Sequence, residues 1–187
     1  MAENVKVGII GAMDSEVALL KSRVEGEQTH ELAGLEFVEG MLEGVSVVVV
    51  KCGVGKVNAA MCAQALVSVL GCNRIINTGV AGSLDNRIEI GDIVVSTDAV
   101  EHDMDVTALG YAPGEHPDLH LVAFEADTAL RSAVVVAAGE LDGVNVFEGR
   151  VCSGDQFIGS AAAKERIVST FGGMCCEMEG AAIAHAC

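Results

Sequence analysis

The sequence predicts an α/β fold with a largely parallel sheet, and three observations support this prediction. Short apolar runs that end in glycine, such as residues 5–11, are typical of strands buried on both faces. Other segments repeat their apolar residues every three or four positions, as helices do, most clearly residues 56–70. The two kinds of segment alternate along most of the chain, and this alternation favours parallel strands joined by crossover helices.

The individual elements follow from the local pattern. Strands are expected at residues 5–11, 29–39, 45–51, 74–77, 92–96, 144–152 and 174–178, and the second and third of them are expected to pair through a turn. Helices are expected to begin at Asp14, to span residues 56–70, 126–140 and 161–170, and to begin again at Glu179. In the first helix, Asp14 is the expected N-cap, and Val17, Leu20 and Val24 form the apolar face. Residues 101–119 hold both prolines and no sustained period, so a long loop is expected there.

Composition and charge exclude several classes of protein. With 51% apolar and 20% charged residues, the 187-residue chain is too apolar to be intrinsically disordered, and its length suits a single domain. The net charge of −16 argues against nucleic acid and anionic membranes as partners. The strongest apolar run, residues 45–50, is too short to span a membrane, and the first residues lack a secretory signal, so a soluble cytoplasmic protein is expected. Seven cysteines without Cys-x-x-Cys spacing predict core packing in a reducing compartment.

The polar residues that follow the strands form the candidate site, because ligands of open parallel sheets bind beyond the carboxyl ends of the strands. These residues are Met13, Asp14 and Glu16, residues 77–82, residues 153–158 and residues 177–179. They include several carboxylates but no cluster of lysine or arginine, which suits a sugar with many hydroxyls better than a phosphate. Carboxylates also suit the positive charge that develops when a glycosidic bond breaks, and Phe157 offers a ring to a planar base.

The main candidates also have structural interpretations. In a first helical turn, Glu16 is ordinarily a solvated residue that interacts with the helix dipole. Glu177 and Glu179 fit capping of the last helix as well as they fit a site. Asp155 is either a turn residue or a secondary site residue.

Four other motifs predict no separate function. Residues 53–56 lack the spacing of a P-loop, and residues 8–11 lack that of a dinucleotide-binding turn. The histidines and aspartates within residues 102–120 have no matched second cluster, so no metal site is expected. Residues 175–176, two adjacent cysteines, fit a buried strand better than a nucleophilic site.

Seven ordered strings of residues resemble a known family. They are Val7-Gly-Ile-Ile-Gly-Ala-Met13 followed by Glu16, Cys52-Gly-Val-Gly-Lys-Val-Asn58, Ile76-Asn-Thr-Gly79 with Ala81-Gly82, Gly91-Asp-Ile-Val-Val95, His102-Asp with Asp105-Val-Thr107, Ser153-Gly-Asp155 with Phe157-Ile158, and Glu177-Met-Glu179. In this order they resemble the methylthioadenosine/S-adenosylhomocysteine nucleosidases of the nucleoside phosphorylase superfamily. The resemblance implies a three-layer fold with a mixed, largely parallel central sheet flanked by helices, and hydrolysis of the N-glycosidic bond of both nucleosides without a cofactor.

The resemblance also implies a role for individual residues. Glu16 matches the glutamate that positions and deprotonates the attacking water. Glu179 matches the residue that holds the ribose hydroxyls, and Met178 matches the one that packs under the ribose. Phe157 resembles the ring that stacks on adenine, and Ile158 the residue whose backbone binds the edge of adenine.

Gly82 and Glu177 lie in the matching motifs and complete the expected substrate-binding residues. The family forms homodimers in which a loop of the neighbouring subunit closes the alkylthio pocket, and Leu109 and Pro117 occupy the matching positions. Leu109 stands where the family usually has phenylalanine, and Val80 where it usually has serine beside the sugar.

One part of the family pattern does not occur before Cys187. In the family, a further strand carries a Ser-Asp pair whose aspartate protonates the purine at N7, and a long helix then follows. Residues 1–187 are therefore expected to form a single, truncated nucleoside phosphorylase-like domain, either an impaired fragment or an inactive relative.

Three other functions remain open: a phosphorylase of the same fold, a hydrolase of another adenine nucleoside, and a non-catalytic nucleoside-binding module. The phosphorylase is less expected because phosphorolysis needs arginines around the phosphate. Arg74 begins its strand, and no other arginine is expected at a carboxyl strand end.

Overall fold

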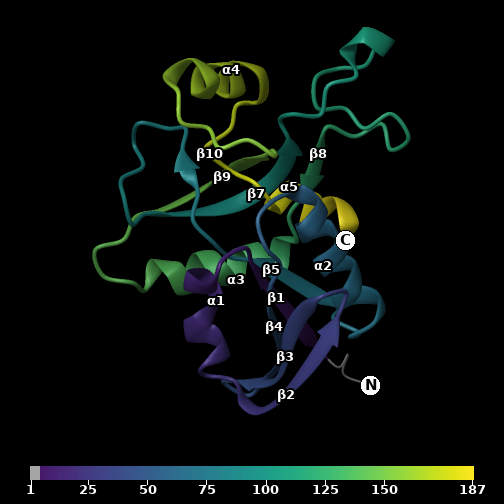
Figure 1. The fold of residues 1–187 in the computed structure, drawn as a ribbon. Helices are drawn as coiled ribbons and strands as arrows, with labels where there is room; N and C mark the ends of the chain where they lie inside the picture. The colour runs from purple at the N-terminus through teal and green to yellow at the C-terminus, as the bar shows by residue number, and fades with distance from the viewer. Residues whose placement is uncertain (1–4) are drawn as a thin grey trace. The chain divides into compact units, whose positions relative to one another are not determined.

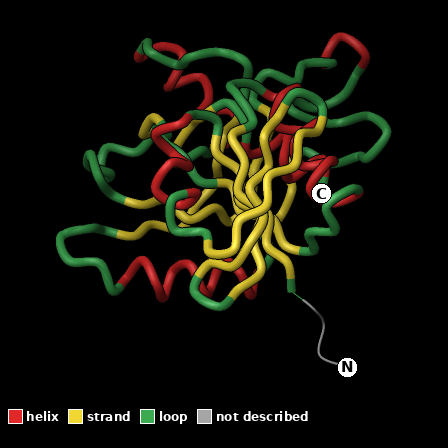
Figure 2. The backbone as a smooth tube through the Cα atoms, turned by 60° about the horizontal axis from the view of Figure 1, so that its bottom comes forward, coloured by secondary structure: helices red, strands yellow, loops and turns green. Residues whose placement is uncertain are grey.

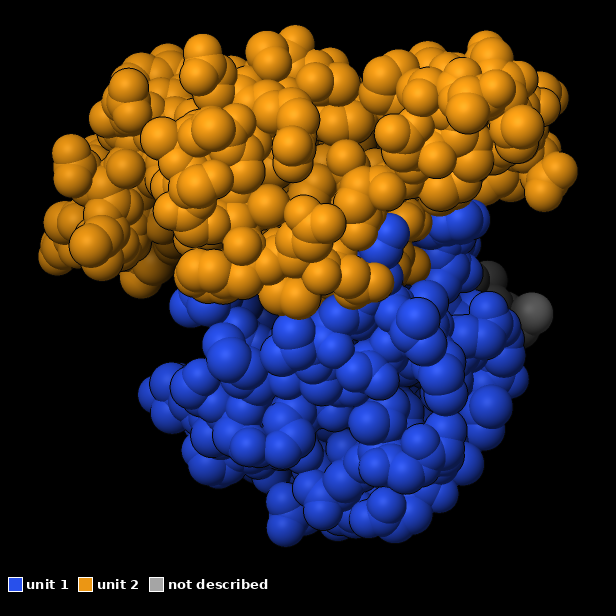
Figure 3. Space-filling model, turned by 45° about the horizontal axis from the view of Figure 1, so that its top comes forward, with its two compact units in different colours: residues 1–80, 185–187 blue, residues 81–184 orange. Residues whose placement is uncertain are grey.

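The computed structural model describes residues 5–187, which form a mixed α/β fold with strands and helices alternating along much of the chain (Figure 1 and Figure 2). The chain divides into two compact units (Figure 3). The first contains the residues up to Val80 together with residues 185–187, and the second contains residues 81–184. Each unit contains one five-stranded sheet. Among the described residues, no helix is long and apolar enough to cross a lipid bilayer.

The sheet of the first unit has the strand order β2-β3-β4-β1-β5. Its strands are β1 (Lys6–Gly11), β2 (Glu25–Leu32), β3 (Leu35–Leu42), β4 (Val45–Lys51) and β5 (Arg74–Asn77), and its helices are α1 (Asp14–Lys21) and α2 (Lys56–Ser68). β1 lies between β4 and β5 and is parallel to both, so the carboxyl ends of these three strands share one edge. β2 and β3 extend the sheet with antiparallel pairing.

Apolar residues of β1 and β4 form the core of this unit. The four consecutive valines 47–50 are at most 3% exposed, and Ile10 in β1 is fully buried. Such burial on both faces is what the glycine-bounded apolar runs predict. α1 packs against β1 and β4, and α2 packs against β1, so both helices hold the strands whose ends carry the candidate residues.

The sheet of the second unit has the order β6-β10-β9-β7-β8. Its strands are β6 (Gly82–Ser83), β7 (Ile93–Glu101), β8 (Ala123–Glu125), β9 (Val146–Ser153) and β10 (Cys175–Glu177); the remaining helices are the 3₁₀ turn η1 (Thr107–Leu109), α3 (Thr128–Gly139), α4 (Ala161–Phe171) and α5 (Gly180–Ala186). β9 is parallel to both β7 and β10, whereas β6 and β8 are antiparallel edge strands.

The predicted α/β class is confirmed, and most elements lie close to their expected residues. The strands that the sequence assigns to one mixed, largely parallel sheet are divided between two mixed sheets, one in each unit. The prediction missed the short edge strands β6 and β8, and β7 continues to Glu101, beyond the expected end at residue 96. Two- and three-residue strands leave almost no periodic pattern, so their pairing partners define them.

The expected strand over residues 29–39 is wrong, because it spans a turn. Ala33 and Gly34 have positive φ angles of 51° and 78°, and Leu32 pairs with Leu35, which makes a two-residue hairpin between β2 and β3. An Ala-Gly turn lacks the Asn or Asp that usually marks such hairpins in a sequence.

The first helix also differs from its prediction. Its N-cap is Met13 rather than Asp14, which is the first helical residue, and the helix ends at Lys21, before Val24. Val24 is nevertheless 9% exposed and belongs to the same apolar cluster as Val17. The segment after the helix, which contains Val24, therefore covers the part of the core that a longer helix was expected to cover.

Six of the seven cysteines are buried as free thiols, as the core-packing interpretation predicts. Burial raises the pKa of the Cys62 thiol and of the Cys152 thiol to about 12. Burial is also the main cause of the raised pKa of Cys175, again about 12, and of the raised pKa of Cys176. Thiols with such pKa values are not nucleophiles at neutral pH.

Candidate active site

Glu16 is held at the carboxyl ends of two parallel strands of the first unit. It lies in the first turn of α1, directly after β1, and its Oε2 accepts hydrogen bonds from the backbone N–H groups of Ala12 (2.7 Å) and Met13 (2.9 Å). Its Oε1 accepts a third bond, from the N–H of Val80 (3.0 Å), three residues after β5. A half-buried carboxylate is therefore fixed between the segment that follows β1 and the segment that follows β5.

Gly79 makes this position possible. A Cβ atom at residue 79 would lie 2.6 Å from Oε1 of Glu16 and 2.9 Å from its Cδ, closer than such atoms approach. The backbone around it is fixed in turn, since the N–H of Thr78 donates to the carbonyl of Ile10 at 2.9 Å. The sequence signal was a glycine two residues after a strand end, within residues 76–79, and its contact with Glu16 was not predicted.

In the second unit, three polar residues stand in one row at the carboxyl edge of the sheet. Glu101 of β7 pairs in register with Ser153 of β9, and Ser153 pairs with Glu177 of β10. The Ser153 hydroxyl is fully buried and donates a hydrogen bond to Oε1 of Glu177. The expected gathering of strand-end residues 153 and 177 is therefore present within this sheet.

This pair caps the first turn of α5. Oε2 of Glu177 accepts hydrogen bonds from the N–H groups of Glu179 (2.9 Å) and Gly180 (2.7 Å), and Oγ of Ser153 accepts one from Ala181 (2.7 Å). Capping and function were equally compatible with the sequence at Glu177, and these contacts favour capping. The side chain supports the turn that carries Met178 and Glu179.

The other candidates of this unit differ in exposure. Glu179 is only 8% exposed, although it is ionisable, and Met178 is half-buried. Ile158 packs its side chain against the apolar cluster around Val100 and Cys152, whereas Phe157 is 90% exposed.

Gly82 begins β6, and Asp155 follows the end of β9 by two residues. Gly82 of β6 pairs with Cys176 of β10, which places it one residue from Glu177. Asp155 is exposed, and its N–H donates to Oδ2 of Asp103 at 2.8 Å, which fits its turn interpretation.

The two residues expected at a subunit pocket lie in the loop that follows β7. Leu109 ends η1 and is 75% exposed, and Pro117 is half-buried. An exposed leucine in a loop leaves apolar surface open to solvent.

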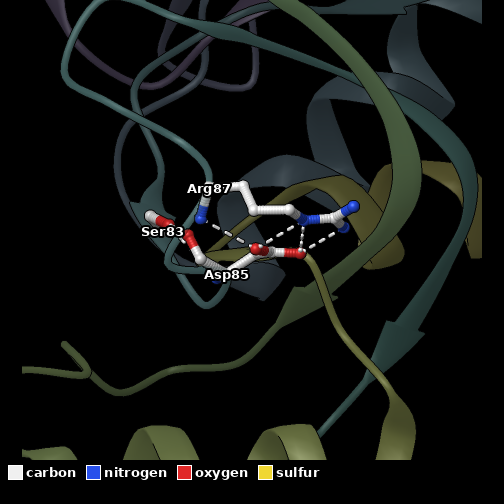
Figure 4. Close-up of polar contacts among 3 residues, drawn as sticks. All are labelled: Ser83, Asp85 and Arg87. Atoms are coloured by element: carbon white, nitrogen blue, oxygen red, sulfur yellow. Dashed lines mark hydrogen bonds and ion pairs between the residues drawn. The ribbon is translucent and has the colours of Figure 1, made fainter.

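Several arginines are paired with carboxylates. Arg87 binds Asp85 through Nε and Nη2, at 2.6–3.1 Å, and Ser83 donates its hydroxyl to the carbonyl of Asp85 (Figure 4). Hydrogen bonds from Arg87 hold the pKa of Asp85 at about 2, so this pair stays ionised at neutral pH. Arg150 makes a bidentate ion pair with Asp98 in the middle of the second sheet. Because these guanidinium groups are paired with carboxylates within the fold, they do not favour a phosphate site.

Comparison with known proteins identifies the family. A family model described as the phosphorylase superfamily matches residues 6–187. The chain belongs to this superfamily.

Similar proteins within the superfamily include nucleosidases. The 5'-methylthioadenosine/S-adenosylhomocysteine nucleosidase of Geobacillus kaustophilus is 44% identical over 184 residues, which make up 98% of this chain and 78% of the relative. The nucleosidase of Colwellia psychrerythraea, solved in complex with adenine, is 38% identical with a TM-score of 0.94, over 99% of this chain and 77% of that one. The nucleosidase of Neisseria meningitidis, in complex with methylthio-immucillin-A, is 37% identical with a TM-score of 0.93, over 97% of this chain and 79% of that one.

Proposed function

We propose that this protein hydrolyses the N-glycosidic bond of 5'-methylthioadenosine and S-adenosylhomocysteine, releasing adenine and the thioribose. The observation that carries the proposal is the Glu16 carboxylate, which three backbone N–H groups fix beside the carboxyl ends of β1 and β5. The relatives that align with 98% of this chain are named for this activity, which supports the same two substrates.

Glu16 is the general base of the proposed reaction. It takes a proton from a water molecule while the water oxygen bonds to C1′ of the ribose. The C1′–N9 bond breaks, and its electron pair passes to the purine. Positive charge develops on the ribose in the transition state, and a fixed carboxylate stabilises that charge. The purine is protonated at N7 and leaves as neutral adenine.

Residues of the second unit are proposed to bind the nucleoside. Glu179 accepts hydrogen bonds from the ribose hydroxyls, and Met178 packs under the ribose. Phe157 has an exposed ring that is available to stack on adenine, and the backbone of Ile158 binds the edge of the base. Gly82, with no side chain, leaves room next to the end of β10.

By the resemblance to the family, we assign protonation of the purine at N7 to the aspartate of the family's Ser-Asp pair. This chain covers about four fifths of the length of its relatives. The proposal treats residues 1–187 as the larger part of one nucleoside phosphorylase-like domain.

The proposed assembly is a homodimer in which Leu109 and Pro117 complete the alkylthio pocket of the neighbouring subunit. The 75% exposure of Leu109 supports this role, because an apolar side chain in a loop gains from burial in a partner. Size-exclusion chromatography with light scattering tests it, and a monomeric mass would contradict it.

A cytoplasmic location is proposed from the cysteines. All seven are free, and six are buried, which fits a reducing compartment. Fractionation of cells that produce the protein tests this, and recovery outside the cytoplasm would contradict it.

Release of adenine from methylthioadenosine in phosphate-free buffer tests the proposed function. Residues 1–187 are assayed beside a chain that extends through the length of the relatives. We expect the extended chain to release adenine without phosphate, and residues 1–187 to be slower by a factor of about 10²–10⁴, which is typical for a lost general acid.

Each other outcome contradicts a stated part of the proposal. A requirement for phosphate would indicate a phosphorylase. Equal rates for the two chains would place the proton donor within residues 1–187. Binding of the nucleoside without any release by either chain would indicate a binding module, and release from another adenine nucleoside alone would change the substrate.

A further inference from the structure

The hydrogen bonds of Glu16 distinguish its two carboxylate oxygens. A carboxylate has about four acceptor sites, two on each oxygen. Oε2 accepts the N–H groups of Ala12 and Met13, so both of its sites are filled, whereas Oε1 accepts only the N–H of Val80. Within residues 5–187, these are the only hydrogen bonds that the carboxylate accepts, so one acceptor site remains, on Oε1.

The surroundings of Oε1 are open to solvent. The residues beside it, Gly79 and Val80, are both exposed, and Val80 is 72% exposed. Gly79 lies against Oε1 with no side chain, and the side chain of Val80 has no polar atom. A water molecule can therefore reach the remaining acceptor site of Oε1 without displacing a protein group.

We propose that Gly79 is a positioning residue that keeps Oε1 of Glu16, the oxygen with the remaining acceptor site, in place for the attacking water. The inference rests on the proposed hydrolysis and adds the reacting atom and its support. The proton moves from water to Oε1, the water oxygen forms a bond to C1′, and the C1′–N9 electron pair leaves with the purine.

Gly79→Ala tests the positioning role because its Cβ would occupy the space of the carboxylate. The displaced Glu16 would keep its charge but lose the alignment of Oε1 with the water. We expect kcat to fall by a factor of about 10²–10³, within the range of general-base catalysis, and KM to change by less than about threefold. A purely structural defect would instead lower the thermal midpoint and the fraction of active protein without a selective loss of kcat.

Gly139→Ala is the matched control. Gly139 ends α3, its added Cβ would meet nothing within 4 Å, and its φ is not in the left-handed region. We expect this variant to keep the kcat and KM of the parent protein, with a thermal midpoint no lower than that of the parent, because alanine favours a helix more than glycine does.

A double variant separates a clash with Glu16 from any other effect of the new methyl group. Glu16→Asp withdraws the carboxylate by one methylene and makes room for the Cβ at residue 79. Adding Gly79→Ala to Glu16→Asp should then cost less than about threefold in kcat, although it costs about 10²–10³ when Glu16 is unchanged. If Gly79→Ala alone does not fold, the double variant should fold, because the clash is relieved.

The outcomes also distinguish this inference from the proposed function. If the extended parent chain does not release adenine, the proposed function is wrong. If the parent is active and Gly79→Ala keeps full kcat, the inference is wrong while the function stands. An equal loss from Gly79→Ala in the parent protein and in the Glu16→Asp variant, or failure of both Gly79→Ala proteins to fold, would also overturn it.

Discussion

At the scale of single residues, Glu16 stabilises the start of α1 in addition to its proposed catalysis. Its carboxylate accepts the N–H groups of Ala12 and Met13, which have no partner within the helix. The sequence placed Glu16 correctly after a strand, but it did not show that the backbone of the next parallel strand end binds the same carboxylate. That contact joins residues 64 positions apart, and no local pattern encodes it.

Glu16→Ala should therefore destabilise the protein as well as inactivate it. Loss of the cap should lower the free energy of unfolding by about 0.5–2 kcal/mol. Glu16→Gln keeps an acceptor oxygen, so its free energy of unfolding should fall by less. Urea unfolding followed by circular dichroism measures both values. Equal stability of the parent protein and the alanine variant would contradict the capping role.

The elements of the second unit depend on buried polar contacts that join neighbouring strands. Ser153 and Glu177 connect the ends of β9 and β10 to the first turn of α5. The sequence predicted these strand ends and the start of the helix, because both follow from apolar pattern. The partner of each carboxylate depended on strand order, which the sequence did not specify.

Ser153→Ala should weaken this connection. The change leaves the N–H of Ala181 and one oxygen of Glu177 without their partner, at a cost of about 1–3 kcal/mol. We expect KM for methylthioadenosine to rise, because Met178 and Glu179 lie in the turn that loosens. Ser169→Ala is the control, since that exposed hydroxyl bonds only within its own helix, and unchanged KM in Ser153→Ala would contradict the role.

The first sheet contains an ionic cluster that predicts a pH dependence. Glu39 of β3 accepts a hydrogen bond from Lys6 (2.6 Å) and lies 3.0 Å from Nε2 of His30. The bond from Lys6 is the main cause that lowers the pKa of Glu39 below its usual 4.5. A lowered folded-state pKa adds stability that is present above the unfolded value and is lost as pH falls through the folded value.

We therefore expect the parent protein to lose more stability between pH 5 and pH 3 than Glu39→Gln does. The expected difference is small, because the side chain of Glu39 is 30% exposed and solvent screens the pair. Thermal melts across this pH range measure it. Parallel pH profiles for the two proteins would show that the cluster adds no stability.

At the scale of the whole molecule, the net charge of −16 is a source of self-repulsion. Composition alone predicts this property, because it depends on the number of charges more than on their partners. The α/β class is predicted at the same level, from the alternation of patterns. The division into two sheets was not predicted, because strands of both sheets have the same apolar composition.

Added salt should stabilise the protein by screening this repulsion. Raising sodium chloride from about 0.02 to 0.5 M shortens the screening length several-fold, and we expect Tm to rise by about 3 °C, equivalent to about 1 kcal/mol. Differential scanning calorimetry measures the change. A constant or falling Tm would show that attractive ion pairs outweigh the repulsion.

The catalytic role of Glu16 is tested most directly by a comparison of Glu16→Gln with Glu165→Gln in the extended chain. Glu165 is an exposed residue of α4, so its substitution matches the change of charge away from the site. We measure adenine release and the affinity for methylthioadenosine in phosphate-free buffer. Glu16→Gln should bind the nucleoside but lose adenine release by a factor of at least about 10², while Glu165→Gln should match the parent. Adenine release by Glu16→Gln at the parent rate would contradict the catalytic role of Glu16.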